Sequence, residues 1–211
     1  MLFYYGSLVL SNCLLVISFL FGILKRPVLQ KKEKWYVYYL GYILCIEIIV
    51  KLLIFIYSAK STYLVYPFYV SGEFFLLSAM FITELKISRK WYIVNGLITA
   101  VIFIRTVLLV INNPGVTDNA SKIFSHLLIV CLAGYSLIKA LGSFEKKNKF
   151  LIIYACLFLY YSVSLLFFLL LDQLKMLSDF NASTIWGMNN VLSSILYGAS
   201  LYTFISSKRS Q

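Results

Sequence analysis

The stretch from residue 35 to residue 57 reads WYVYYLGYILCIEIIVKLLIFIY, and it decides the class of fold. Almost all of its residues are apolar or aromatic, and the basic sequence KKEK (residues 31–34) stands directly before it. The hydrocarbon core of a bilayer is about 30 Å thick, so an α-helix needs about 20 apolar residues to cross it. The stretch therefore predicts a transmembrane helix whose first turn lies at a membrane surface.

Six further apolar stretches of similar length lie before and after this one. Together the predicted spans are Leu2–Leu24, Trp35–Tyr57, Thr62–Thr83, Trp91–Asn112, Ser121–Leu141, Phe150–Leu171 and Ser183–Ile205. The connections between them are short and leave no room for a soluble domain. We therefore predict an all-α fold, a seven-transmembrane-helix bundle that forms a single membrane domain over residues 1–211.

The composition excludes the other broad classes. The chain is 61% hydrophobic and only 13% charged, whereas about a quarter of the residues of an average soluble domain are charged. Such a chain cannot cover a surface that faces water on all sides. Intrinsic disorder is excluded as well, because disordered chains are poor in apolar residues.

The positive charges predict the orientation. Fourteen of the nineteen Lys and Arg residues lie on one side of the predicted spans, within residues 25–34, 86–90, 139–149 and 208–209. Only Lys60, Lys122 and Lys175 lie at the opposite ends. Because cytoplasmic loops are enriched in Lys and Arg, we predict that the N-terminus is outside and the C-terminus is in the cytoplasm. The net charge of +11 is then an orientation signal with an attraction to anionic membrane lipid, and not a sign of nucleic-acid binding.

The chemistries of several membrane enzymes and photoreceptors are absent from the sequence. The single histidine cannot supply the ligands of a zinc site, and the last predicted span contains no lysine that could bind retinal. The four cysteines lie in separate spans without a Cys-x-x-Cys pattern, as is typical of packing residues. We therefore expect no enzymatic activity, no metal and no cofactor.

Polar side chains inside the spans are the candidate site residues. A charge at the bilayer centre costs roughly 2.5–3.5 kcal/mol on insertion scales, and it persists where it is paired or faces a cavity. These residues gather near one depth, so they can form a polar pocket that opens outward. They are Glu47, Lys51, Glu73, Arg105, His126, Asn189 and Asn190.

Two interpretations of these residues stay open. In the structural one, Glu47–Lys51 and Glu73–Arg105 are ion pairs that fix the helices, and the asparagines join helices by hydrogen bonds. In the functional one, the same side chains bind a ligand or an ion. For His126 alone, the plainer interpretation is a histidine that water reaches near the membrane surface.

Three short stretches carry a resemblance to a known group of proteins. They are GEFFLL (residues 72–77), FLYYS (residues 158–162), and Trp186 with Asn189 and Asn190. In these positions and in its layout the chain resembles small stand-alone bacterial seven-helix membrane proteins, which are similar to the membrane input modules of sensor kinases. The resemblance implies a receptor-like or sensory protein of the bacterial inner (cytoplasmic) membrane, without catalytic residues.

The functional expectation combines the pocket with this resemblance. We expect recognition of a small ligand or membrane component in the outward-facing pocket. Since the 211 residues contain no output domain, the signal would pass to a separate partner protein. The alternatives are a small-solute transporter that uses the same pocket and a structural or accessory membrane subunit.

Overall fold

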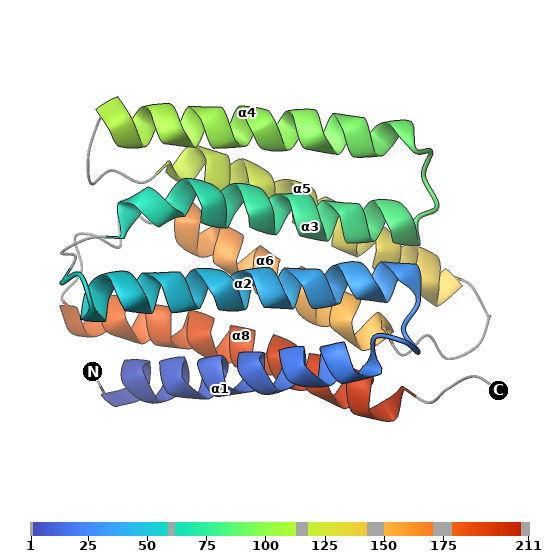
Figure 1. The fold of residues 1–211 in the computed structure, drawn as a ribbon, viewed down its shortest axis with the longest axis horizontal. Helices are drawn as coiled ribbons and strands as arrows, with labels where there is room; N and C mark the ends of the chain where they lie inside the picture. Colours follow the sequence, from blue (N-terminus) through green and yellow to red (C-terminus); the bar gives the residue numbers. More distant parts are fainter. Residues whose placement is uncertain (1, 59–61, 113–117, 143–149, 171–178, 208–211) are drawn as a thin grey trace. The chain divides into compact units, whose positions relative to one another are not determined.

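The computed structural model describes residues 2–58, 62–112, 118–142, 150–170 and 179–207. Within these ranges the chain is all-α and forms seven α-helices (Figure 1). They are α1 (Leu2–Lys25), α2 (Lys31–Phe55), α3 (Tyr66–Glu84), α4 (Lys90–Asn112), α5 (Asn119–Gly142), α6 (Leu151–Leu169) and α8 (Asp179–Ser206), with a short 3₁₀ turn, η1 (Tyr63–Val65), before α3. Each predicted span is confirmed as a helix, with ends that differ from the prediction by at most four residues.

Six of these helices in the described ranges, α1 to α6, are long and apolar enough to cross a membrane. The seventh, α8, has 28 residues and is long enough, but it does not reach the same hydropathy. The reason is its composition, because Asn, Ser and Thr residues recur along its whole length. That α8 also crosses the membrane stays a prediction, and so does the orientation, since several of the basic connections lie outside the described residues.

The contacts between residues divide the chain into two compact units. The first comprises Met1–Gln30 and His126–Gln211, and the second comprises Lys31–Ser125. The boundary falls inside α5, so this helix contributes residues to both units. The single membrane domain over residues 1–211 stays a prediction.

In the second unit, α3 packs against α2 on one side and α4 on the other (Figure 1). This explains why α3 is the most enclosed of the six spans. Its first turn contains Pro67, which is tolerated there because the first amides of a helix have no carbonyl partner within the helix. Its buried apolar residues form the core of the unit: Val70, Phe74, Leu77, Ala79, Met80, Phe81 and Ile82.

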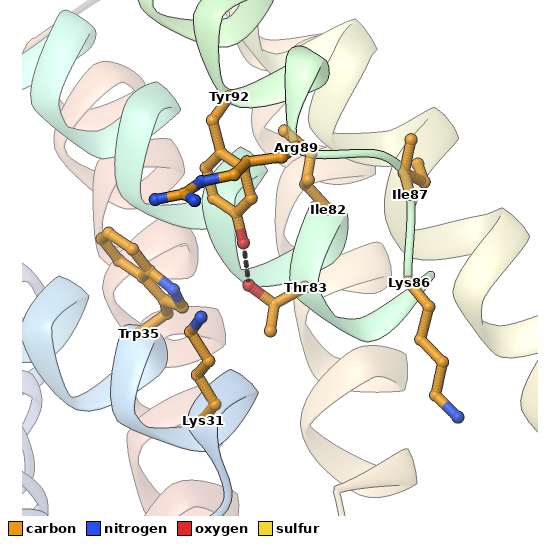
Figure 2. Close-up of a pocket in the computed structure, with 8 residues that line it drawn as sticks. All are labelled: Lys31, Trp35, Ile82, Thr83, Lys86, Ile87, Arg89 and Tyr92. Atoms are coloured by element: carbon orange, nitrogen blue, oxygen red, sulfur yellow. Dashed lines mark hydrogen bonds between the residues drawn. The ribbon is translucent and has the colours of Figure 1, made fainter.

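The end of α3 is closed by a left-handed turn at Lys86, whose φ is 54°. The backbone N–H of Lys86 donates to the carbonyl of Thr83 at 3.3 Å, and that of Ile87 donates to the carbonyl of Ile82 at 3.2 Å. These two bonds satisfy carbonyls that the helix itself leaves without a partner. Beside this turn the start of α2, the end of α3 and the start of α4 border an open pocket of about 720 Å³ (Figure 2).

In the first unit, α1 and α8 lie side by side (Figure 1). The buried face of α1 is made mainly of small residues, Ser7, Ser11, Ser18 and Gly22, which allow two helix backbones to approach closely. The Oγ atoms of Ser11 and Ser193 are 2.8 Å apart, and the Ser18 hydroxyl donates to the carbonyl of Tyr197 at 2.7 Å. Part of the polar character of α8 therefore serves its packing against α1.

Candidate functional site

A buried ion pair joins α3 to the first turn of α5. The Nζ atom of Lys122 donates a hydrogen bond to the Glu73 carboxylate, and the two side chains are each only 2% exposed. The same Nζ atom lies 4.0 Å from the centre of the Tyr69 ring, where the negative face of the ring attracts a cation. The pair thus carries opposite charges into the interior of the unit and neutralises them there.

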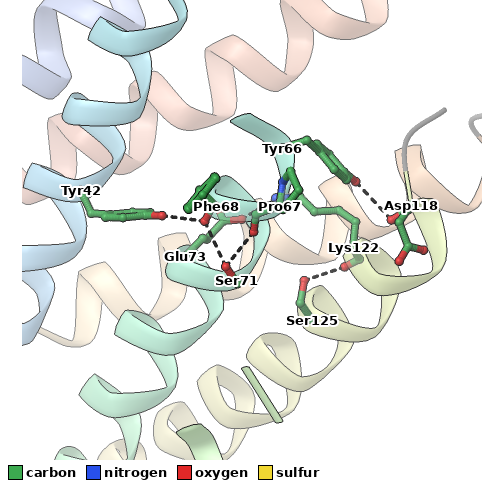
Figure 3. A network of polar contacts seen from close by, with 9 residues as sticks. All are labelled: Tyr42, Tyr66, Pro67, Phe68, Ser71, Glu73, Asp118, Lys122 and Ser125. Carbon is green, nitrogen blue, oxygen red and sulfur yellow. Dashed lines mark hydrogen bonds and ion pairs between the residues drawn. The ribbon is translucent and has the colours of Figure 1, made fainter. Parts of the chain in front are cut away.

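A second ion pair lies at the start of α5. Nε of Arg105, on α4, is 3.2 Å from Oδ2 of Asp118. The Asp118 carbonyl accepts a hydrogen bond from the Tyr66 hydroxyl at 3.3 Å (Figure 3). Asp118 also caps α5, because its Oδ1 accepts the backbone N–H of Ser121 at 3.1 Å and its Oδ2 accepts the Ser121 hydroxyl. Asp118 is buried, whereas the Arg105 side chain is 59% exposed.

The two ion pairs, Glu73–Lys122 and Arg105–Asp118, form a polar cluster. Further polar contacts lie next to it, along the first turns of α3. The Tyr42 hydroxyl donates to the carbonyl of Phe68 at 2.6 Å, and the Ser71 hydroxyl donates to the carbonyl of Pro67 at 2.7 Å (Figure 3). The Tyr42 ring lies against Gly72, where a side chain would have no room: a Cβ atom there would stand 2.2 Å from Cζ of Tyr42. The absence of a side chain at Gly72 therefore lets α2 and α3 approach closely.

The predicted pairing of Glu73 with Arg105 is wrong. The structure brings both residues to the same end of the second unit, but Glu73 pairs with Lys122 and Arg105 pairs with Asp118. The sequence placed Lys122 at the outer end of a span, whereas Lys122 and Asp118 are both buried. The segment Asp118–Lys122 is the start of a helix, and this start lies against α3.

The predicted pairing of Glu47 with Lys51 is not seen. Both residues lie on α2 at the expected spacing, with Glu47 partly buried and Lys51 exposed. Within the described residues, their charged atoms do not form an ion-pair contact.

His126 lies in the first unit and is only 1% exposed, so it is not the water-accessible histidine that the sequence suggested. Its ring meets Tyr161 edge-on, with the ring centres 4.9 Å apart, and Phe168 in the same way at 5.5 Å. Phe168 in turn contacts Trp186 of α8 at 6.2 Å between ring centres. The histidine is therefore enclosed by aromatic residues of α6.

Asn189 and Asn190 are consecutive residues of α8, also in the first unit. The side-chain Oδ1 of Asn189 and Nδ2 of Asn190 are buried, and neither has a hydrogen-bond partner among the described residues. The backbone carbonyl of Asn190 is by contrast well used, since the hydroxyls of Ser193 and Ser194 donate to it at 2.9 and 2.8 Å. The two side chains thus present one free acceptor and one free donor.

Two residues of the polar cluster were missed from the sequence. Asp118 has a recognisable signal, because an Asp directly before a helical apolar run is typical of a helix N-cap. Lys122 has no comparable signal, because a lysine at the edge of a span usually extends to the membrane surface. Only the packing of α5 against Glu73 shows that it is buried.

The six long apolar helices define a multi-pass integral membrane protein. Its second unit contains buried ion pairs, and its first contains two buried amide atoms without a hydrogen-bond partner among the described residues. Comparison with known proteins adds no closer assignment: no family model, no curated protein and no solved structure matches the chain.

Proposed function

We propose that the protein is a receptor-like membrane protein that recognises a small polar ligand, or the polar group of a membrane component, through Asn189 and Asn190. One observation carries this proposal: two consecutive residues of α8 hold a buried amide acceptor and a buried amide donor, each without a partner among the described residues. An unsatisfied buried polar group costs about 1–3 kcal/mol. A ligand that offers both a donor and an acceptor would recover that free energy.

The charged cluster has a different role in this proposal. Glu73 and Lys122 are buried and neutralise each other, so they hold α3 and α5 together rather than attract a ligand. Arg105 is the accessible member of the cluster and the one best placed to meet an anionic group. We propose that the ligand signal passes to a separate partner protein in the bacterial inner membrane.

The test is the thermal unfolding of the full chain in detergent, followed by intrinsic fluorescence with glutamine, glucose, glycerol or succinate added. Asn190→Leu is of similar size and removes the free donor, so we expect a higher melting temperature and loss of stabilisation by any solute that stabilises the wild type. The matched control is Asn112→Leu, which changes an exposed asparagine at the end of α4. Stabilisation retained in Asn190→Leu would contradict the proposal.

The outward-facing site also requires the predicted orientation. The 23 residues of α4 are about 34 Å long, so Ser88, before its start, and Asn112, at its end, would lie on opposite membrane surfaces. With the native cysteines replaced, Asn112→Cys should react with a membrane-impermeant maleimide on intact cells, whereas Ser88→Cys should react only after lysis. The reverse pattern would place the N-terminus in the cytoplasm and overturn this part of the proposal.

A further inference from the structure

We propose that the pocket between the ends of α2, α3 and α4 binds a phosphate group, and that its source is the headgroup of an anionic phospholipid. This basic pocket is lined by Lys31, Trp35, Ile82, Thr83, Lys86, Ile87, Arg89 and Tyr92. It lies entirely in the second unit and shares no residue with the site on α8. It is therefore independent of the function proposed above.

Charge is the first argument. Three of the lining residues are cationic, and none of those that the structure describes is a carboxylate. The nearest acidic neighbour in the sequence, Glu84, is held by Lys32, whose Nζ lies 2.6 Å from Oε2 of Glu84. The excess positive charge of the pocket is therefore not cancelled by that carboxylate.

The arrangement of the cations is the second argument. Figure 2 shows the ammonium group of Lys31 and the guanidinium group of Arg89 on the side of the pocket where Trp35 lies, whereas the ammonium group of Lys86 points away from them. Lys31 is the first residue of α2 and Arg89 directly precedes α4. Helix N-termini carry positive partial charge, so both helices add to the attraction for an anion. Guanidinium and ammonium groups are also the preferred partners of phosphate oxygens.

The apolar part of the pocket decides between a lipid and a free phosphate compound. Trp35 and Tyr92 form a tilted aromatic pair with ring centres 6.4 Å apart, and Ile82 and Ile87 add aliphatic surface. The hydroxyls of Thr83 and Tyr92 bond to each other at 2.5 Å, which leaves the ring faces for apolar contact. Aromatic rings beside basic residues at the ends of spans are typical of the headgroup level of a bilayer. A phospholipid would place its phosphate on the cations and its glycerol and first methylene groups on these rings.

The experiment measures the thermal stabilisation of the full chain in a neutral detergent by dioctanoyl phosphatidylglycerol, dioctanoyl phosphatidylcholine and free glycerol 3-phosphate. We expect the anionic lipid to stabilise the protein at lower concentration than the zwitterionic one. The variant Lys31→Gln with Arg89→Gln should weaken binding of the anionic lipid by about fivefold for each cation removed. Glycerol 3-phosphate distinguishes a lipid from a soluble phosphate compound. If it stabilises the protein at the same concentration as the lipid does, the pocket recognises phosphate but the lipid is not its source.

The matched control is Lys34→Gln with Lys90→Gln. It has the same net charge as the test variant and lies at the same end of the unit, but neither residue lines the pocket. Because Lys31, Arg89 and Lys90 are exposed and Lys34 is partly exposed, both double variants should fold and melt as the wild type does without lipid. If both double variants lose the same amount of affinity for the anionic lipid, the attraction comes only from diffuse surface charge. If the two lipids stabilise the protein equally, the pocket does not recognise the charge of the headgroup. Either result would overturn the proposal.

Discussion

Lys122 and Glu73 are separated by 49 residues in the sequence and form a hydrogen-bonded ion pair in the interior of one unit. Both are closed off from solvent, so the pair cannot exchange either partner for water without a local opening. In a bilayer the cost of separating such charges is higher than in water, because the low dielectric strengthens their attraction and water is absent. The pair therefore fixes the first turn of α5, which belongs to the second unit, against α3.

Removing one member of this pair should cost far more than removing both. Glu73→Gln leaves the Lys122 charge buried without its carboxylate partner, and we expect a loss of about 3–5 kcal/mol in the free energy of unfolding. Replacing the pair with apolar residues, Glu73→Leu with Lys122→Met, should cost much less. Denaturant titration of the purified protein in detergent gives both values. A double variant less stable than Glu73→Gln would contradict this account of the pair.

Asp118 has two tasks that its variants can separate. Asp118→Ala loses both the helix cap and the charge, and the cap alone should cost about 0.5–2 kcal/mol. Asp118→Asn keeps a capping oxygen and loses only the charge opposite Arg105. Since the Arg105 side chain is 59% exposed, Arg105→Met should cost no more than about 1 kcal/mol. Equal destabilisation by Asp118→Ala and Asp118→Asn would rule out the capping role.

Two glycines on neighbouring helices of the second unit should respond to alanine with opposite signs. Gly72→Ala forces the Tyr42 ring away and breaks its hydrogen bond to Phe68, so we expect a loss of about 1–3 kcal/mol. At Gly96 nothing lies within 4 Å of the added Cβ, so alanine should stabilise the helix by about 1 kcal/mol. The melting temperatures of the two variants test these opposite signs. In a Tyr42→Leu background, the loss caused by Gly72→Ala should become smaller, whereas the gain from Gly96→Ala should not change.

The contact between α1 and α8 can be tested by cross-linking. In a chain without its four native cysteines, Ser11→Cys with Ser193→Cys should form a disulfide readily under mild oxidation, since the two hydroxyl oxygens are 2.8 Å apart. Ser11→Cys with Ser200→Cys is the control, because Ser200 lies about 10 Å further along α8. Cross-linking that is no faster in the first pair than in the control would contradict the packing of these helices.

The helices were predictable from the sequence because the length of an apolar run is a property of the chain alone. The stretch 35–57 needs no knowledge of its neighbours to be identified as a span. The choice of ionic partners is different, because it depends on how each helix is rotated about its axis and on which helices are neighbours. Glu73 and Arg105 were predicted to lie near one depth, but only the packing shows that Lys122 pairs with Glu73 and that Asp118 pairs with Arg105.

The basic pocket illustrates a second limit. Lys31, Lys86 and Arg89 were counted among the cations that set the orientation, and Trp35 belongs at the membrane surface for the same reason. The sequence alone does not show that these residues line one pocket, because they come from the ends of three different helices. The basic residues are thus explained by the orientation of the chain, and only the fold shows that some of them also line a pocket.

The polarity of α8 has a consequence for how the protein is made. A segment with this many Asn, Ser and Thr residues partitions weakly from the translocon into lipid, whereas α1 enters readily. The hydroxyls of Ser11 and Ser18 offer α8 hydrogen bonds that lipid cannot. We expect α1 to insert into the bilayer first and then to promote the insertion of α8 by offering it hydrogen-bond partners. Defects on the small-residue face of α1 would then appear during biogenesis, as failed integration of α8, before they affect the finished protein.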